Sequence, residues 1–98
     1  MPLSTSQKQF LRGLAHQLNP VIMVGQKGIT PTLLKEFSGA LDHHELVKVR
    51  LSGGDREQRS SQIEEMCAAS GAELVQTIGH TASFWRRNAE EAKLPLPK

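Results

Sequence analysis

The chain has 98 residues, a length that suits one domain built around a single hydrophobic core. Its formal net charge is +2, and its content of 38% hydrophobic and 22% charged residues is ordinary for a globular domain. The single cysteine, Cys67, excludes an internal disulfide and a metal site built from several cysteines. No apolar run approaches the roughly 18 residues of a membrane span, and the first residues lack the pattern of a signal peptide, so we expect a cytoplasmic protein without membrane contact.

Basic residues are concentrated near the start of the chain. Residues 1–35 contain Lys8, Arg12, Lys27 and Lys35 but neither Asp nor Glu. If the first helix lies beside the glycine-containing turn at 25–28, one face of the domain is basic, and such a face favours phosphate-rich partners. The alternative is a solvated surface on which the charge is uneven by chance.

The first predicted helix begins at Ser4. Ser4 and Gln7 have the spacing of a capping box, in which each side chain pairs with the backbone of the other residue. An apolar stripe at helical spacing follows, made by Phe10, Leu11, Leu14, Ala15 and Leu18. Lys8 and Arg12, four residues apart, share a face of this helix, which we expect to end before Pro20.

The segment 21–31 organises the chain. Its first four residues are apolar and predict a short strand that is buried on both faces. A turn with glycine at both ends follows, Gly25-Gln26-Lys27-Gly28, and Thr30 with Pro31 then starts a helix that runs to about Asp42. A glycine turn at a helix N-terminus favours anions, and Lys27 adds a cation. Two glycines at this spacing are also common in ordinary turns, which is the alternative for the motif alone.

The second helix and the strand after it carry three further features. Gly39 inside the helix predicts a close approach by another element. The run Asp42-His43-His44-Glu45 is interpreted as a polar helix end and not as a metal site, because adjacent side chains point in different directions. In the strand predicted at 46–51, Lys48 and Arg50 face one way, and they either belong to a binding surface or blunt an exposed sheet edge.

A third helix and a hairpin are predicted in the remainder of the chain. Asp55 caps the helix, Gly71 ends it, and Cys67 is expected on its buried side. Two strands, at 73–78 and 81–86, then pair across a tight turn.

Trp85 is followed by the pair Arg86-Arg87 at the end of this hairpin. An aromatic side chain beside two cations suits stacking on a base together with contact to a phosphate. The alternative is a tryptophan that is half buried at a sheet edge.

The predicted order of elements is α-β-α-β-α-β-β within residues 1–87. We expect an α/β fold of a single domain, in which a mixed four-stranded sheet packs against three helices. Strands joined by a helix pair in parallel, whereas the strands of a hairpin pair antiparallel. Residues 88–98 are predicted to form a C-terminal tail, to which we assign no role.

Several separated motifs match a known family at once. They are KQFLRGLAH at 8–16, NPV at 19–21, GQKGIT at 25–30, HELVKV at 44–49 and QTIGHT at 76–81. The chain resembles the CRM domain (chloroplast RNA splicing and ribosome maturation) from about Leu3 to Arg86. It is similar in particular to the free-standing bacterial form of this domain, the YhbY family.

The resemblance implies a fold similar to that of the C-terminal domain of translation initiation factor three. It also implies that the turn at 25–28 contacts the RNA backbone, much as the GxxG loop of KH domains does, and that the RNA is precursor large-subunit ribosomal RNA in the pre-50S particle. The residues assigned to RNA binding are Gly25, Gln26, Lys27 and Gly28 of the loop, together with Lys8, Arg12, Lys35 and Arg86. These last four are our own addition, chosen as basic residues near the loop or near Trp85.

This chain departs from the family pattern at two positions. Trp85 stands where relatives often have tyrosine, a change that stacking would survive. Ser83 stands at a strand position that is usually apolar, which leaves the packing of that strand open.

The sequence favours a monomeric binding protein without catalytic residues, metal or cofactor. Its histidines and Cys67 are not paired by any motif, and Gly28 is followed by Ile29 rather than by the Lys-Ser or Lys-Thr of a P-loop. The alternative function is a protein-interaction domain that docks on a ribosomal protein, through the mixed-charge face of the third helix.

Overall fold

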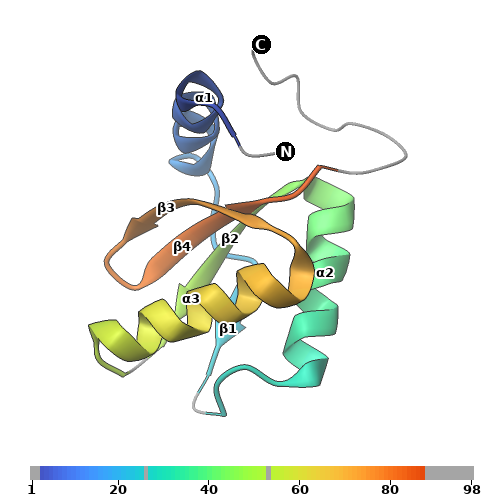
Figure 1. Ribbon diagram of the computed structural model, residues 1–98, viewed down its shortest axis with the longest axis vertical. Coiled ribbons are helices and arrows are strands. Elements are labelled where there is room, and N and C mark those ends of the chain that lie inside the picture. The colour runs from blue at the N-terminus through green and yellow to red at the C-terminus, as the bar shows by residue number, and fades with distance from the viewer. Residues whose placement is uncertain (1–2, 26, 53, 88–98) are drawn as a thin grey trace.

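The computed structural model describes residues 3–25, 27–52 and 54–87, so Gln26, Gly53 and the predicted tail 88–98 lie outside the described residues. Within these ranges, three helices and four strands follow one another in the predicted order (Figure 1). Their bounds are α1 Thr5–Ala15, β1 Ile22–Val24, α2 Pro31–His44, β2 Leu46–Leu51, α3 Arg56–Ser70, β3 Glu73–Ile78 and β4 Thr81–Trp85. The prediction of an α/β domain with a mixed four-stranded sheet is confirmed.

The four strands lie in the order β1-β2-β4-β3. β1 runs parallel to β2, while β4 is antiparallel to both of its neighbours. β4 comes last among the strands along the chain but lies inside the sheet, and β1 and β3 form the edges. The register of β3 shifts between Leu74 and Gln76, so that Val75 is an extra residue on that strand.

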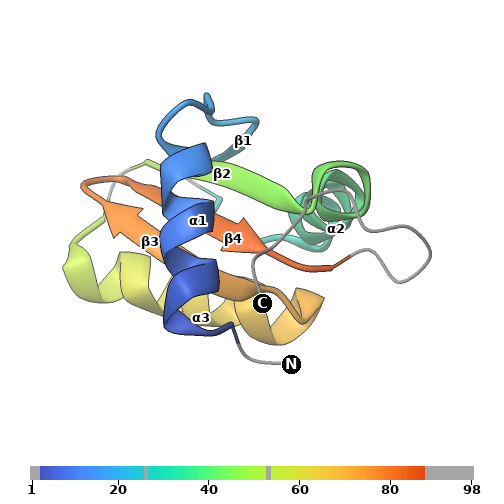
Figure 2. The ribbon, with the colours of Figure 1, turned by 90° about the horizontal axis from the view of Figure 1, so that it is seen from above.

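The two faces of the sheet are covered by different helices. α2 and α3 pack on one face, and α1 crosses the other (Figures 1 and 2). The larger hydrophobic cluster lies under α2 and α3, where the rings of Phe37 and Phe84 meet edge to face with centroids 5.0 Å apart. The smaller cluster lies under α1 and consists of Leu11, Ala15, Leu46, Val75 and Trp85.

The helix ends follow the predicted capping chemistry. The hydroxyl of Ser4 accepts a hydrogen bond from the N–H of Gln7, which completes the capping box. The side chain of Asp55 caps α3 in the same way. Gly71 ends α3 with φ at 77°, the left-handed conformation that a C-cap of this kind requires.

The prediction that the first strand is buried on both faces is wrong. Ile22 and Val24 are buried, whereas Val21 and Met23 are 57% and 65% exposed. The second face would need a helix above it, but α1 packs on β2 and β3 and does not extend over β1, which is an edge strand. Part of the α1 face of the sheet is therefore open.

Three other expectations also change. Gly39 is exposed, and a Cβ at this position would have no neighbour within 4 Å among the described residues, so no close approach explains it. β2 is an interior strand, so Lys48 and Arg50 do not blunt a sheet edge. Trp85 is only 7% exposed under α1, so it is a core side chain rather than a stacking platform or an edge residue.

Candidate nucleic-acid interface

The loop that follows β1 is a tight turn closed by backbone. The N–H of Gly28 donates to the carbonyl of Gly25 at 3.0 Å, and Gly28 has φ at 70°. This left-handed conformation disfavours any residue with a Cβ, which is the physical reason for glycine at this position. Lys27 is exposed at the loop, and Gln26 lies outside the described residues.

The N-terminus of α2 points its dipole toward this loop. The hydroxyl of Thr30 accepts a hydrogen bond from the N–H of Leu33 at 3.1 Å, and Pro31 has no N–H to offer. The first three residues of α2 are Pro31, Thr32 and Leu33. Of their N–H groups, only that of Thr32 is left without a partner within the described part of the chain. No acidic residue stands in the first turn, so the partial positive charge of the helix end is not offset there.

A second loop lies beside the first. The N–H and the hydroxyl of Ser52 both donate to the carbonyl of Val24, at 3.0 Å and 2.5 Å, which joins the ends of β1 and β2. Each of these parallel strands is followed by a loop and then by a helix, so both loops lie together at the carboxyl ends of β1 and β2. α3 also backs the first loop, because the amide nitrogen of Gln62 lies 3.6 Å from where a Cβ on Gly28 would stand.

The basic residues predicted to surround the loop are not brought together. Lys35 is exposed in the second turn of α2, close along the chain to the loop. Lys8 and Arg12 are on α1, which lies at the opposite end of the molecule from the loop (Figure 1). The expectation that the first helix lies beside the loop is therefore wrong, because the apolar side of α1 packs where β2, β3 and β4 bring Leu46, Val75 and Trp85 together.

Arg86 holds the fold instead of projecting into solvent. Its guanidinium donates to the carbonyls of Ser70 and Ser38 at 2.7 Å and 2.9 Å, and it forms an ion pair with Asp42 at 2.8 Å. Its side chain is 21% exposed, and it fastens the end of α3 to the last turns of α2. The structure thus gives this predicted RNA contact a structural role.

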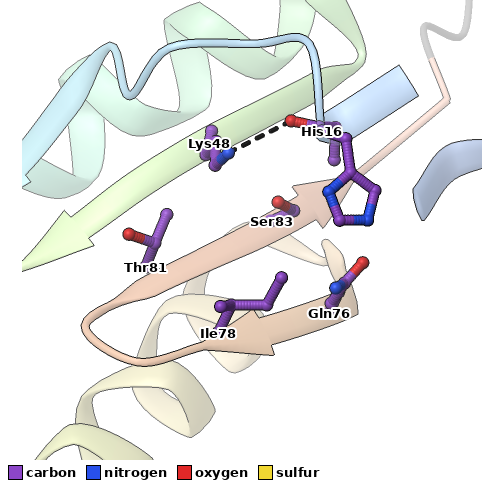
Figure 3. Close-up of a pocket in the computed structure, with 7 residues that line it drawn as sticks. His16, Lys48, Gln76, Ile78, Thr81 and Ser83 are labelled. Carbon is purple, nitrogen blue, oxygen red and sulfur yellow. Dashed lines mark hydrogen bonds between the residues drawn. The ribbon is translucent and has the colours of Figure 1, made fainter. Parts of the chain in front are cut away.

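Lys48 has a role that the sequence did not reveal. Its ammonium group donates to the carbonyls of Ala15 and Leu18, at 3.1 Å and 3.2 Å, and so satisfies the C-terminal end of α1. Figure 3 shows Lys48 beside a small concavity whose lining includes His16, Gln76 and Ser83. Ser83 is buried here at 4% exposure, on an interior strand. The alternation of Lys48 with apolar residues predicts the face of β2 on which it lies. It does not predict the carbonyl groups that Lys48 binds, because these belong to a segment about 30 residues earlier in the chain.

The polar run at the end of α2 has mostly structural partners. The rings of His43 and His44 pack edge to face, 4.6 Å between centroids, Asp42 pairs with Arg86, and Glu45 is fully buried. Across the described residues, no three His, Cys, Asp or Glu side chains are grouped so that they could hold a metal ion. None of the described helices is both long and apolar enough to span a bilayer.

Comparison with known proteins identifies the family. Residues 3–86 match the model of the CRS1 / YhbY (CRM) domain. The chain belongs to the CRM-domain family. A relative from Haemophilus influenzae, named "RNA-binding protein", is 51% identical over 96 residues, which cover 98% of this chain and 96% of the relative.

Further members of the family support the same comparison. A Pseudomonas aeruginosa protein named as a probable RNA-binding protein is 39% identical over 93 residues, covering 95% of this chain and 89% of that one. The solution structure of a hypothetical protein from Staphylococcus aureus, titled as a putative RNA-binding protein, matches with a TM-score of 0.83 and 31% identity. The match covers 98% of the present chain and all of the S. aureus chain. The fold and the family assignment thus rest on similarity over almost the full length.

Proposed function

We propose that this CRM-domain protein is a non-catalytic RNA-binding protein that acts on precursor ribosomal RNA during assembly of the large (50S) ribosomal subunit. The observation that carries the proposal is the glycine loop at 25–28, which is held between the end of β1 and the N-terminus of α2 with Lys27 exposed. The names of the relatives support RNA as the ligand class. The ribosomal target is what the resemblance to the bacterial YhbY form implies.

The loop suits an RNA backbone for three physical reasons. Gly25 and Gly28 have no side chains, so a sugar–phosphate chain can approach the protein backbone closely. The dipole of α2 and the unpaired N–H of Thr32 favour a phosphate at this point. Lys27 adds a charge that is screened by salt, so the affinity falls with salt at a log–log slope of about −0.7 to −0.9 for each phosphate neutralised.

The contact set is revised by the geometry. We keep the loop residues Gly25, Gln26, Lys27 and Gly28 together with Lys35. Lys8 and Arg12 lie on α1, at the opposite end of the molecule from the loop, so we leave them out of the contact set (Figure 1). We leave Arg86 out, because its guanidinium is engaged by backbone carbonyls and by Asp42. The protein acts as a cytoplasmic monomer and needs no cofactor in this scheme.

The test is crosslinking of the protein to RNA in cells, followed by sequencing of the bound RNA. The first variant combines Gln26→Asp with Lys27→Asp, and we expect it to lose about tenfold or more of the crosslinks, because two carboxylates would face a phosphate. The thermal midpoint should stay within a few degrees of the wild-type value, since Lys27 is exposed. The matched control makes the same chemical change on α1, with Gln9→Asp and Lys8→Asp.

Enrichment of one region of large-subunit ribosomal RNA, lost in the loop variant and largely kept in the α1 variant, would support the proposal. Equal losses in the two variants would show that net charge, rather than the loop, determines binding. Crosslinks that are absent or scattered in the wild type, with retention on a ribosomal protein that survives nuclease and high salt, would replace RNA binding by protein docking.

A further inference from the structure

The part of the sheet face that α1 leaves open carries one side chain from each strand. The row consists of Met23 on β1, Arg50 on β2, Thr81 on β4 and Ile78 on β3, which are paired across the sheet. These side chains point to the α1 side, because the alternating neighbours Ile22, Val49 and Ala82 are buried in the cluster on the other side. We call Met23, Arg50, Thr81 and Ile78 the open row.

The open row is both apolar and cationic. Met23 and Ile78 are 65% and 54% exposed, and Arg50 is exposed between them. Within the described residues, no hydrogen bond or ion pair engages the guanidinium of Arg50. The next row toward α1 is formed by Lys48, Ser83 and Gln76, and neither row contains an acidic residue. Exposed apolar side chains that flank a free cation are typical of an interaction surface.

The surface around the open row is a platform rather than a pocket. The concavity between the open row and α1 has a volume of about 10 Å³, room for about one water molecule (Figure 3). The side-chain oxygen of Gln76 is buried there without a hydrogen-bond partner among the described residues. A ligand on this side of the sheet would therefore lie across the open row rather than inside a cavity.

The open row is continuous with the glycine loop. Met23 stands two positions before Gly25, and Arg50 stands two positions before Ser52, which is bonded to the end of β1. The turn between β3 and β4 lies at the same end of the sheet, because the N–H of Leu51 donates to the carbonyl of His80 at 2.7 Å. The open row and the glycine loop therefore lie side by side at one end of the sheet, close enough for one strand to contact both.

We propose that the open row binds unpaired nucleotides of the same RNA strand whose backbone the loop holds. The inference rests on the function proposed above. An unpaired base offers a flat face on which the guanidinium of Arg50 can stack, and Met23 and Ile78 cover the remaining apolar surface. The Thr81 hydroxyl can donate to or accept from a base edge. Bases in an RNA duplex are stacked inside the helix and cannot lie on this row.

RNA fits this face better than a protein partner does. Arg50 is exposed on the open row, and neither this row nor the next one contains an acidic side chain, which complements a polyanion. The open row also lies next to the start of the proposed phosphate-binding loop, so both surfaces can bind one strand at once.

The test compares two arginines of equal charge on opposite sides of the sheet. Arg50→Gln removes the guanidinium from the open row, and Arg56→Gln removes one from the exposed first turn of α3. The probes are a fluorescent single-stranded oligouridine and an RNA duplex of the same length, bound to the full chain. We expect Arg50→Gln to weaken single-strand binding about five- to tenfold and duplex binding about twofold or less, and Arg56→Gln to change either by about twofold or less.

A second variant removes the apolar contacts without changing charge. Met23→Ser combined with Ile78→Ser should weaken single-strand binding about as much as Arg50→Gln does, with an unchanged salt slope because no phosphate contact is lost. All three side chains are exposed, so the thermal midpoints should match that of the wild type.

Each outcome separates this inference from the function on which it rests. If the wild type binds neither probe, the proposed function fails and the open row fails with it. If the Gln26/Lys27 variant loses RNA binding but Arg50→Gln behaves like Arg56→Gln, RNA binding by the loop is supported. Binding of nucleotides by the open row is then ruled out. If Arg50→Gln lost the same affinity for the single strand and for the duplex, Arg50 would act only through its charge and not by stacking on unpaired bases. Unchanged RNA affinity in both open-row variants would show that RNA does not bind the open row.

Discussion

The face of the sheet under α2 and α3 is covered by the larger hydrophobic cluster and leaves only the β3 edge near Leu74 exposed, whereas the face crossed by α1 is covered over only part of its width. Phe37, Phe84 and Met66 on the first face are fully buried, and Arg86 fastens the two helices that cover it. On the second face, Met23 and Arg50 have no helix above them. The comparison teaches that one sheet can supply stability on one side while it keeps side chains free for a ligand on the other.

The largest effect is expected from neighbouring residues of β1 that point to opposite faces. Ile22→Ala should lower the free energy of unfolding by about 2–3 kcal/mol, because a buried side chain is removed from the face under α2 and α3. Met23→Ala should change it by about 0.5 kcal/mol or less. Urea denaturation of the two variants measures both values. A similar loss of unfolding free energy for Met23→Ala would mean that the α1 face is packed at β1, and the two faces would then not differ there.

Arg86→Gln should lower stability with little effect on RNA affinity, whereas Arg50→Gln should lower RNA affinity with little effect on stability. Arg86→Gln is expected to lower the free energy of unfolding by about 2 kcal/mol, since it removes charge-assisted hydrogen bonds to two partly buried carbonyls, while RNA affinity changes by about twofold or less. Asp42→Asn is the control and should cost about 1 kcal/mol or less, because the Asp42 side chain is 70% exposed. A large loss of RNA affinity in folded Arg86→Gln protein would restore that residue to the binding site.

The smallest expected effect is a pH dependence of stability that arises from Cys67, whose side chain packs against the cluster under α2 and α3. Burial raises the pKa of its thiol, aided by the carboxylates of Glu73 and Glu64 and opposed by a backbone hydrogen bond at Leu74. The folded chain then holds a proton that the unfolded chain releases, so this contribution to stability is complete below the ordinary thiol pKa and is lost as the pH rises through the folded value.

Denaturation on either side of about pH 9 should therefore show a fall in the stability of the wild type that is smaller in Cys67→Ala. Iodoacetamide should also alkylate the native thiol more slowly than a cysteine peptide at the same pH. Alkylation at the rate of the peptide would show that α3 does not shield this side chain.

The elements of the fold could be predicted because their signals are local. Ser4 with Gln7, Asp55 and Gly71 act on backbone groups within a few residues, so sequence spacing is sufficient to place the helix ends. The glycine loop was predictable for the same reason, since Thr30 and Pro31 mark the helix start that follows it.

The placement of α1 could not be predicted, because it depends on three distant segments. The apolar side of α1 packs where Leu46, Val75 and Trp85 meet, and only the strand order brings these together. That same order determines that Trp85 is a core residue. It also brings the carbonyls of Ser38 and Ser70 within reach of Arg86, although these residues lie 48 and 16 positions away along the chain. The open row was missed as well, since it exists only through the register of four strands.

Of the four described strands, β4 is the last to be synthesised, yet it lies between β2 and β3. Until Thr81–Trp85 has left the ribosome, β2 can pair only with β1, and β3 has no neighbour. Phe84 also belongs to the larger cluster, so the core under α2 and α3 closes only when nearly the whole domain has been translated. A chain released before β4 is complete exposes strand edges that other chains can pair with, which makes premature termination a route to aggregation for this domain.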